Sequence, residues 1–179
     1  MGRSELRLTG SGGQGVILLS IIIADIALQS GKNVAQSQAY GPEARGGLCK
    51  AEVVISSEKI GYTKVINPTF LLALTQESLE KYTKNIDENC VVVADSTLKI
   101  PEGIKCKEVH QYAILETAKE KVGKLFTANI VACEVICELL KLATPEEIKA
   151  TVARYIPKGT EEINFKALEA GHNLYLLGE

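Results

Sequence analysis

The chain has 179 residues, which is enough for one domain with a full hydrophobic core, and a hydrophobic content of 46% excludes a disordered chain. A net charge of −2 excludes electrostatic steering to nucleic acid or to anionic lipid, and the absence of tryptophan leaves no visible base-stacking platform. Five cysteines without a Cys-x-x-Cys pair exclude the usual cradle of an iron–sulfur cluster and fit a reducing compartment.

The N-terminal residues are polar, and the first long apolar run begins only at Val16. This run has about thirteen residues and includes Ser20 and Asp25, so it is shorter than a membrane span and does not resemble a secretory signal. We therefore expect a cytoplasmic protein that does not bind or cross a membrane.

A glycine-rich turn is the first informative motif. A strand predicted over residues 6–9 leads into Gly10-Ser11-Gly12-Gly13-Gln14-Gly15, and a helix predicted over 15–30 follows and ends at Gly31. Such a turn brings backbone N–H groups to a helix N-terminus, where they suit an anion or a closely approaching partner. The helix is apolar nearly all round, so we expect a sheet on one side and a second cover, from this chain or another, on the other.

The spacing of Gly10, Gly12 and Gly15 matches the G-x-G-x-x-G pattern of dinucleotide-binding loops. That pattern also requires an acidic residue at the end of the second strand, and the strand predicted over 33–38 ends without one. No Gly-Lys-Ser/Thr follows, which excludes a P-loop. Two interpretations stay open: a subunit contact that uses the amide of Gln14 as donor and acceptor, and a free-standing Rossmann-like protein that binds a nucleotide or coenzyme A.

A second turn-rich segment follows the strand over 33–38 and reads Tyr40-Gly41-Pro42-Glu43-Ala44-Arg45-Gly46-Gly47. We predict that it lies at the carboxyl edge of a parallel sheet, beside the first glycine loop, where open α/β sheets bind ligands. Arg45 offers a planar fork for a carboxylate or phosphate, and Glu43 offers a charge for a basic group of a partner. An internal contact between Arg45 and Glu43 that shapes the loop is the alternative.

The rest of the chain continues an α/β pattern. Strands are predicted over 48–56, 70–75, 90–94 and 109–113, and helices over 77–86 and 115–121. After Thr127 the pattern is helical only, with helices predicted over 129–142, from Thr144-Pro145 onward, and over 161–176. We therefore predict one domain over residues 1–179, a three-layer α/β domain with a mostly parallel sheet and a helical C-terminal region.

No pattern of a catalytic apparatus is visible, and we predict no catalytic residue. His110 and His172 stand far apart in the sequence, and no serine or cysteine lies in a nucleophile motif. Cys133 and Cys137 have the spacing of one helical turn, but an apolar helix favours core positions for them, and we predict no metal site. Asp95, at the end of a predicted strand, is expected to cap a loop or helix.

The two loops, taken in order, resemble a known family. Gly10–Gly15 opening the first helix and Tyr40–Gly47 after the second strand are similar to motifs of the gamma subunit of 2-oxoacid:ferredoxin oxidoreductases. The resemblance covers essentially the whole chain, including Asp95-Ser96 and Thr127-Ala128-Asn129. Enzymes of this kind oxidatively decarboxylate a 2-oxoacid, pass the electrons to ferredoxin and transfer the acyl group to coenzyme A.

The resemblance implies a non-catalytic subunit of such a complex. It places thiamine diphosphate, Mg²⁺ and iron–sulfur clusters in partner alpha, beta and ferredoxin-like delta subunits, and this chain has neither a Gly-Asp-Gly thiamine motif nor cluster cysteines. A separate short gamma chain suits a 2-oxoglutarate-type complex, although pyruvate, branched-chain and indolepyruvate enzymes have similar gamma chains. The residues that match the family motifs, and that we expect to face the catalytic subunit, are Gly10, Gly12, Gly13, Gln14, Gly15, Tyr40, Gly41, Pro42, Glu43, Arg45, Gly46 and Gly47. Contact of these loops with coenzyme A stays open.

Overall fold

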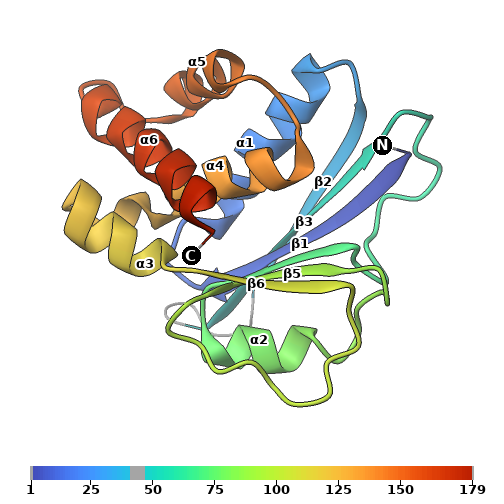
Figure 1. Ribbon diagram of the computed structural model, residues 1–179. Helices are drawn as coiled ribbons and strands as arrows, with labels where there is room; N and C mark the ends of the chain where they lie inside the picture. The colour runs from blue at the N-terminus through green and yellow to red at the C-terminus, as the bar shows by residue number, and fades with distance from the viewer. Residues whose placement is uncertain (1, 41–46, 179) are drawn as a thin grey trace.

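A six-stranded sheet lies at the centre of the computed structural model, which describes residues 2–40 and 47–178 (Figure 1). The strand order is β2-β3-β1-β4-β5-β6. Among the described strands β3 runs opposite to the other five, so it pairs antiparallel with β1 and β2, while β1, β4, β5 and β6 pair in parallel. The predicted mostly parallel sheet is therefore confirmed. The strands are β1 (Arg3–Ser11), β2 (Asn33–Tyr40), β3 (Leu48–Ser56), β4 (Phe70–Ala73), β5 (Val91–Asp95) and β6 (Glu108–Tyr112).

Helices lie on both faces of the sheet and complete three layers (Figure 1). One face is covered by α1 (Val16–Gln29) and by the C-terminal helices, and the other face carries the short α2 (Gln76–Tyr82). The C-terminal elements are α3 (Ile114–Glu116), the π-helical turn η1 (Thr117–Val122), the 3₁₀ turn η2 (Leu125–Thr127), α4 (Ala128–Leu140), α5 (Pro145–Tyr155) and α6 (Glu161–Leu177). No helix in the described part of the chain has the length and apolar character needed to cross a bilayer.

The apolar helix α1 is covered by this chain itself. It packs against β2 and β3 on one side and against α4 and α5 on the other. Leu19, Ile22 and Ile23 are fully buried between these layers. The second cover that the sequence leaves open is therefore provided within the chain. Burial on both sides also explains why α1 has few polar positions.

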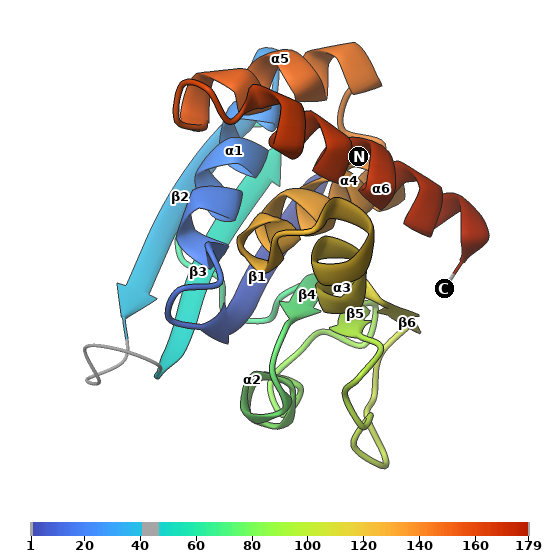
Figure 2. The same ribbon diagram turned by 90° about the vertical axis from the view of Figure 1, so that its left-hand side faces the viewer.

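The strand β3 lies between β1 and β2, which differs from a simple parallel β-α-β unit. It pairs antiparallel with both strands, so that Leu48 is opposite Ser11 of β1 and Cys49 is opposite Tyr40 of β2. A short turn-rich connection between β2 and β3 favours such an antiparallel pair, since parallel neighbours need a long crossover. The start of β3 thereby lies beside the end of β1, at the carboxyl edge of the sheet (Figure 2).

A buried ion pair ties β1 to β3 on the face away from α1. The Nε of Arg7 lies 2.8 Å from a carboxylate oxygen of Glu52, and both side chains are less than a tenth exposed. The same guanidinium donates to the backbone oxygen of Val65 at 3.1 Å and lies 5.7 Å from the ring centre of Tyr82. Because the guanidinium has several partners, the free-energy cost of removing its charge from water is offset. The pair links β1 and β3 near the middle of the sheet.

Candidate functional site

The glycine loop joins the end of β1 to the start of α1. Gly13 has a φ of 97° and Gly15 a φ of 72°, both in the left-handed region that glycine adopts without strain. Gly15 is the N-cap of α1, and its backbone oxygen accepts a hydrogen bond from the N–H of Leu19 at 2.9 Å. Gly12 and Gly13 are exposed, so the tip of the turn faces outward.

Two of the glycines make room for side chains of the protein itself. A Cβ at Gly10 would lie 2.5 Å from Oε1 of Gln14, and a Cβ at Gly15 would lie 2.5 Å from Nδ2 of Asn129. Real Cβ atoms do not approach that closely, so a side chain at either position would displace the amide of Gln14 or of Asn129, and at Gly15 the positive φ adds backbone strain. At Gly13 a Cβ would meet nothing within 4 Å, which leaves the outer part of the turn open.

The side chain of Gln14 braces the loop from inside. Its Oε1 accepts a hydrogen bond from the backbone N–H of Ser11 at 2.7 Å, and its Nε2 donates to the backbone oxygen of Leu74 at 3.5 Å. These two contacts link the turn to the segment that follows β4. The amide therefore has an internal role, and its predicted contact with a partner subunit stays a prediction.

Asn129, which the resemblance includes only as part of a helix start, contacts the glycine loop. It lies in the first turn of α4, is 5% exposed, and donates from Nδ2 to the backbone oxygen of Gly15 at 3.4 Å. Thr127-Ala128-Asn129 reads only as a helix start in the sequence, because 114 residues separate Asn129 from Gly15. The contact fixes the N-terminus of α4 beside the N-terminus of α1.

The second predicted loop is only partly within the described residues. Gly41, Pro42, Glu43, Arg45 and Gly46 lie outside them, whereas Tyr40 ends β2 and Gly47 directly precedes β3. The N–H of Gly12 donates to the backbone oxygen of Gly47 at 3.0 Å. The first loop and the described ends of the second are therefore at the same edge of the sheet (Figure 2).

Exposed apolar side chains lie in the turn that leads to Asn129, and others lie at the start of α1. Leu125 and Phe126 of η2 are 55% and 60% exposed, and Phe126 stands one helical turn before Asn129. Ile17 and Leu18, in the first turn of α1, are half-buried. We call this set, together with Gly12 and Gly13, the glycine-loop surface. Large exposed apolar side chains that gather beside a functional loop are typical of protein interaction sites.

The other polar residues noted in the sequence have structural partners. The buried carboxylate of Asp95 accepts hydrogen bonds from the backbone N–H groups of Thr97 at 3.1 Å and Leu115 at 2.8 Å, which is the predicted capping role. His110 forms an exposed pair with Glu108 at 3.1 Å. Cys133 and Cys137 are buried in α4. A hydrogen bond with Cys133 and burial raise the pKa of the Cys137 thiol well above its ordinary value, so it is a protonated core residue.

The arrangement does not meet the requirements of a dinucleotide site. The end of β2 would have to supply a carboxylate beside the end of β1, yet β3 lies between the two strands. The side chains of Gln14 and Asn129 also occupy the space beside Gly10 and Gly15, where a pyrophosphate would approach. What remains for contact with another molecule is the outer turn at Gly12 and Gly13 and the apolar side chains around it.

Comparison with known proteins gives consistent findings. The family model described as pyruvate ferredoxin/flavodoxin oxidoreductase matches residues 5–174. Subunit KorC of 2-oxoglutarate synthase from Methanocaldococcus jannaschii is 39% identical over 175 residues, which cover 96% of this chain and 94% of that subunit. Subunit VorA of ketoisovalerate oxidoreductase from Methanothermobacter thermautotrophicus is 33% identical, over 93% of this chain but only 35% of VorA.

A solved structure shares the fold and much of the sequence. The crystal structure of the gamma subunit of a keto/oxoacid ferredoxin oxidoreductase from Geobacter sulfurreducens superposes with a TM-score of 0.87 and 38% sequence identity. The match covers 99% of both chains. The fold described above is therefore shared with that gamma subunit over nearly all of both chains.

Proposed function

This chain belongs to the pyruvate ferredoxin/flavodoxin oxidoreductase family, and from that premise we propose that it is the gamma subunit of a 2-oxoacid:ferredoxin oxidoreductase complex. In such a complex a 2-oxoacid is oxidatively decarboxylated, the acyl group passes to coenzyme A and the electrons pass to ferredoxin. The chain contributes an assembly surface to this reaction. Thiamine diphosphate, Mg²⁺ and iron–sulfur clusters belong to the alpha, beta and ferredoxin-like delta partners in this proposal.

The proposed 2-oxoacid is 2-oxoglutarate. The similarity to the 2-oxoglutarate synthase subunit extends over nearly the whole of both chains, at 39% identity. The similarity to the ketoisovalerate enzyme is lower, at 33% identity, and is confined to about a third of a longer subunit. A separate gamma chain of this length therefore corresponds best to the 2-oxoglutarate type.

The glycine-loop surface is the proposed contact with the catalytic subunit. The observation that carries this assignment is the exposure of Leu125 and Phe126 in the turn that leads directly to Asn129, the residue that contacts Gly15 of the glycine loop. Complete burial of a large apolar side chain is worth roughly 1.5–3 kcal/mol, so covering the exposed parts of these two, 55% and 60%, would contribute about 2–3.5 kcal/mol. The second loop begins and ends at the same edge, so Arg45 is proposed to add a polar contact there.

Co-purification with the partner subunits tests this assignment. A tagged full chain is recovered from native extract and its partners are identified by mass spectrometry, with a thiamine-dependent subunit as the expected companion. The double variant Leu125→Ser with Phe126→Ser should lose most of that companion. Recovery of the wild-type chain alone, as a monomer, would contradict the proposal.

Leu28 provides a matched control for the double variant. It is 59% exposed, but it lies at the C-terminal end of α1, about 20 Å from the glycine loop along a helix of 14 residues. Leu28→Ser should leave the partner recovery unchanged. If it reduces recovery as much as the double variant does, the contact is not confined to the glycine-loop surface.

The alternative, a free-standing nucleotide- or coenzyme A-binding protein, makes the opposite prediction. Calorimetric titration of the full chain with NAD, FAD and coenzyme A should give no saturable heat, because Gln14 and Asn129 fill the inner part of the loop. Micromolar binding of any of the three to the unaccompanied chain would favour the alternative.

A further inference from the structure

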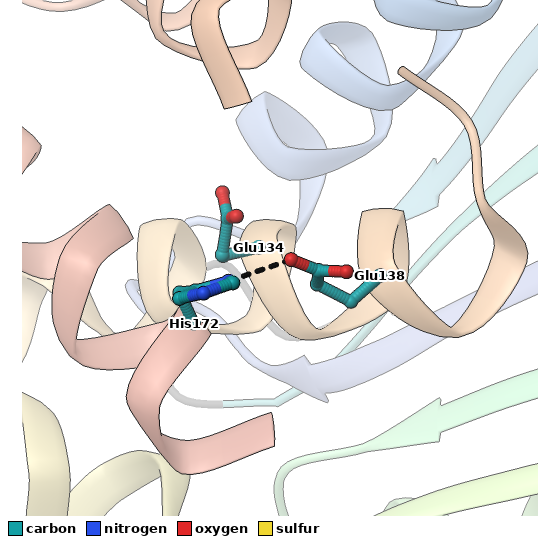
Figure 3. Close-up of side chains that lie close together, drawn as sticks. All are labelled: Glu134, Glu138 and His172. Carbon is teal, nitrogen blue, oxygen red and sulfur yellow. Dashed lines mark hydrogen bonds and ion pairs between the residues drawn. The ribbon is translucent and has the colours of Figure 1, made fainter. Parts of the chain in front are cut away.

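Three side chains of types that bind metals in other proteins meet between α4 and α6. Glu134 and Glu138 lie one helical turn apart on α4, and His172 reaches them from α6 (Figure 3). Nδ1 of His172 is 2.6 Å from Oε1 of Glu138. One ligand atom from each of the three residues lies within 4.8 Å of the other two.

Glu134 distinguishes this cluster from an ordinary group of surface acids. Glu134 is only 3% exposed. Its carboxylate forms no hydrogen bond or ion pair with another residue in the ranges 2–40 and 47–178. Burial, assisted by the nearby Glu138, raises its pKa to about 7. In the described residues no side-chain oxygen is both closed off from solvent and without a hydrogen-bond partner, so the Glu134 carboxylate keeps a small contact with the cavity beside it. A cation in that cavity would give the carboxylate the partner that this chain does not supply.

The carboxylate of Glu134 and the ring of His172 both line a cavity of about 720 Å³. Lys149 and Lys166 line the same cavity, but neither forms an ion pair with Glu134 in the described chain. The Nζ of Lys149 instead lies 4.5 Å from the centre of the Phe165 ring. The available lysines therefore leave the carboxylate unpaired, and a small cation has a route of entry through the cavity.

The packing of the two helices holds the three residues in register. A Cβ at Gly171, which precedes His172, would lie 2.7 Å from the backbone oxygen of Val131 and 2.8 Å from Cβ of Glu134. The absence of a side chain at Gly171 therefore allows α6 to approach α4 closely. The approach brings the imidazole of His172 to the two carboxylates without a loop, so the geometry is fixed by two packed helices.

We propose that Glu134, Glu138 and His172 bind a divalent first-row transition cation, with zinc as the representative ion and water in the remaining position. One imidazole nitrogen and two carboxylate oxygens suit zinc and its neighbours better than Mg²⁺ or Ca²⁺, which prefer oxygen ligands alone. In a tetrahedral zinc site, ligand atoms about 2.0–2.2 Å from the metal are roughly 3.3–3.5 Å apart. The present separations, all within 4.8 Å, would have to adjust to that value by rotation of the side chains when the cation binds. The cation would link α4 to α6, a role independent of the proposed function.

Zinc titration of the full chain tests the site. Chelator-treated protein is titrated with zinc chloride in a calorimeter, and one saturable site of micromolar or tighter affinity is expected. Glu134→Gln and His172→Asn keep the size of each side chain while removing a ligand, and each should weaken zinc binding by about tenfold or more. Circular dichroism of both variants checks that the fold is retained.

Two controls separate this site from adventitious binding. Glu169→Gln removes a carboxylate from the same cavity but not from the cluster, and Cys106→Ser removes the thiol that is not fully buried. Both should bind zinc as the wild type does. The cobalt complex should show visible bands without thiolate charge transfer, since no sulfur is in the site. Absence of saturable zinc binding, or unchanged binding in Glu134→Gln, would overturn the proposal.

Discussion

Gly15 belongs to a glycine pattern that indicates a nucleotide-binding loop, but the structure gives these glycines a different role in internal packing. The G-x-G-x-x-G spacing indicates a backbone that approaches a phosphate, whereas the structure places the Asn129 amide against Gly15 and the Gln14 amide against Gly10. The sequence predicts the turn and its glycines correctly. It does not predict what fills the space beside them, because Asn129 arrives from a helix 114 residues later.

Substitution of Gly15 should be more harmful than substitution of Gly13. Both have positive φ, so alanine at either position costs about 1–2 kcal/mol of backbone strain. At Gly15 the new Cβ also meets Asn129, which adds roughly 1–3 kcal/mol of overpacking. Urea denaturation should give a total loss of about 2–5 kcal/mol for Gly15→Ala and about 1–2 kcal/mol for Gly13→Ala. Equal losses would contradict the packing role of Asn129.

Glu134 should make the stability of the metal-free chain depend on pH. Its pKa is about 7 in the folded chain, against an ordinary value of 4.5, so the folded state retains a proton that the unfolded state releases between these values. The free energy of unfolding therefore falls as the pH rises from about 4.5 to about 7. The groups that face Glu134 or line its cavity are Glu138, His172, Lys149, Lys166, Glu162 and Glu169.

Glu134→Gln stays neutral and should remove this loss. With chelator present, the variant should match the wild type near pH 4 and exceed its stability by about 1–3 kcal/mol at pH 8, since a full pKa unit corresponds to 1.36 kcal/mol. Urea denaturation at a series of pH values measures the difference. A constant difference across the range would show that the carboxyl does not titrate as described.

Helix ends that are set by neighbouring residues in the chain are predicted well from the sequence. Thr144 and Glu147 form the capping box that begins α5, and Gly31 follows the end of α1, as their residue types indicate. The helix predicted over 115–121 is instead a short α3 continued by the π-helical η1. The capping carboxylate of Asp95 holds the start of α3, and this contact spans 20 residues.

The cluster of Glu134, Glu138 and His172 is a functional candidate that sequence reasoning missed. Its local signal is present, since two glutamates four residues apart on an otherwise apolar helix are placed on the same face. The partner histidine lies 34 residues beyond Glu138 on another helix, so its approach depends on tertiary packing. The prediction that the chain holds no metal was based on the spacing of the cysteines and on histidines far apart in the sequence. Neither observation gives information on how α6 packs against α4.

Gly171 should be essential for the packing of α6 on α4. Alanine in the middle of a helix ordinarily stabilises it by about 1 kcal/mol relative to glycine. Here the new Cβ would lie 2.7 Å from the Val131 backbone oxygen, so the helices must separate and Gly171→Ala should destabilise the chain by about 1–3 kcal/mol. Thermal unfolding measures this, with Ala170→Gly as the propensity control. An increase in melting temperature would contradict the close approach.

At the scale of the whole molecule, the sequence predicts the strands better than their order. Each of the six strands overlaps a predicted segment, because apolar runs and turn residues mark them locally. The insertion of β3 between β1 and β2 depends on pairing over about 45 residues, as in the contact between Arg7 and Glu52. Such pairing is decided by competition among strands of similar composition, which no local pattern resolves.

Arg45 belongs to the assembly of the complex in our proposal. Arg45→Ala should leave the isolated chain as stable as the wild type while reducing recovery of partner subunits, because the lost guanidinium would contact another polypeptide. Recovery is measured with tagged chain and native extract, and stability by thermal unfolding. Arg154→Ala is a suitable control, since that guanidinium pairs with Asp25 at 2.6 Å within the chain. A loss of stability in Arg45→Ala without a loss of partners would assign the loop a purely internal role.

The central position of β1 has a consequence for how the chain is made. This strand is the first to be synthesised, yet its neighbours β3 and β4 are completed only at Ser56 and Ala73. At about 5–20 residues per second, the ribosome needs roughly 3–12 s to extend the chain from Ser11 to Ala73. During that interval the backbone hydrogen-bonding groups on both edges of the nascent β1 have no partner strand. The apolar helix α1 has no complete sheet to pack against. The emerging chain therefore exposes both edges of β1 and the apolar surface of α1 until β3 and β4 have been made.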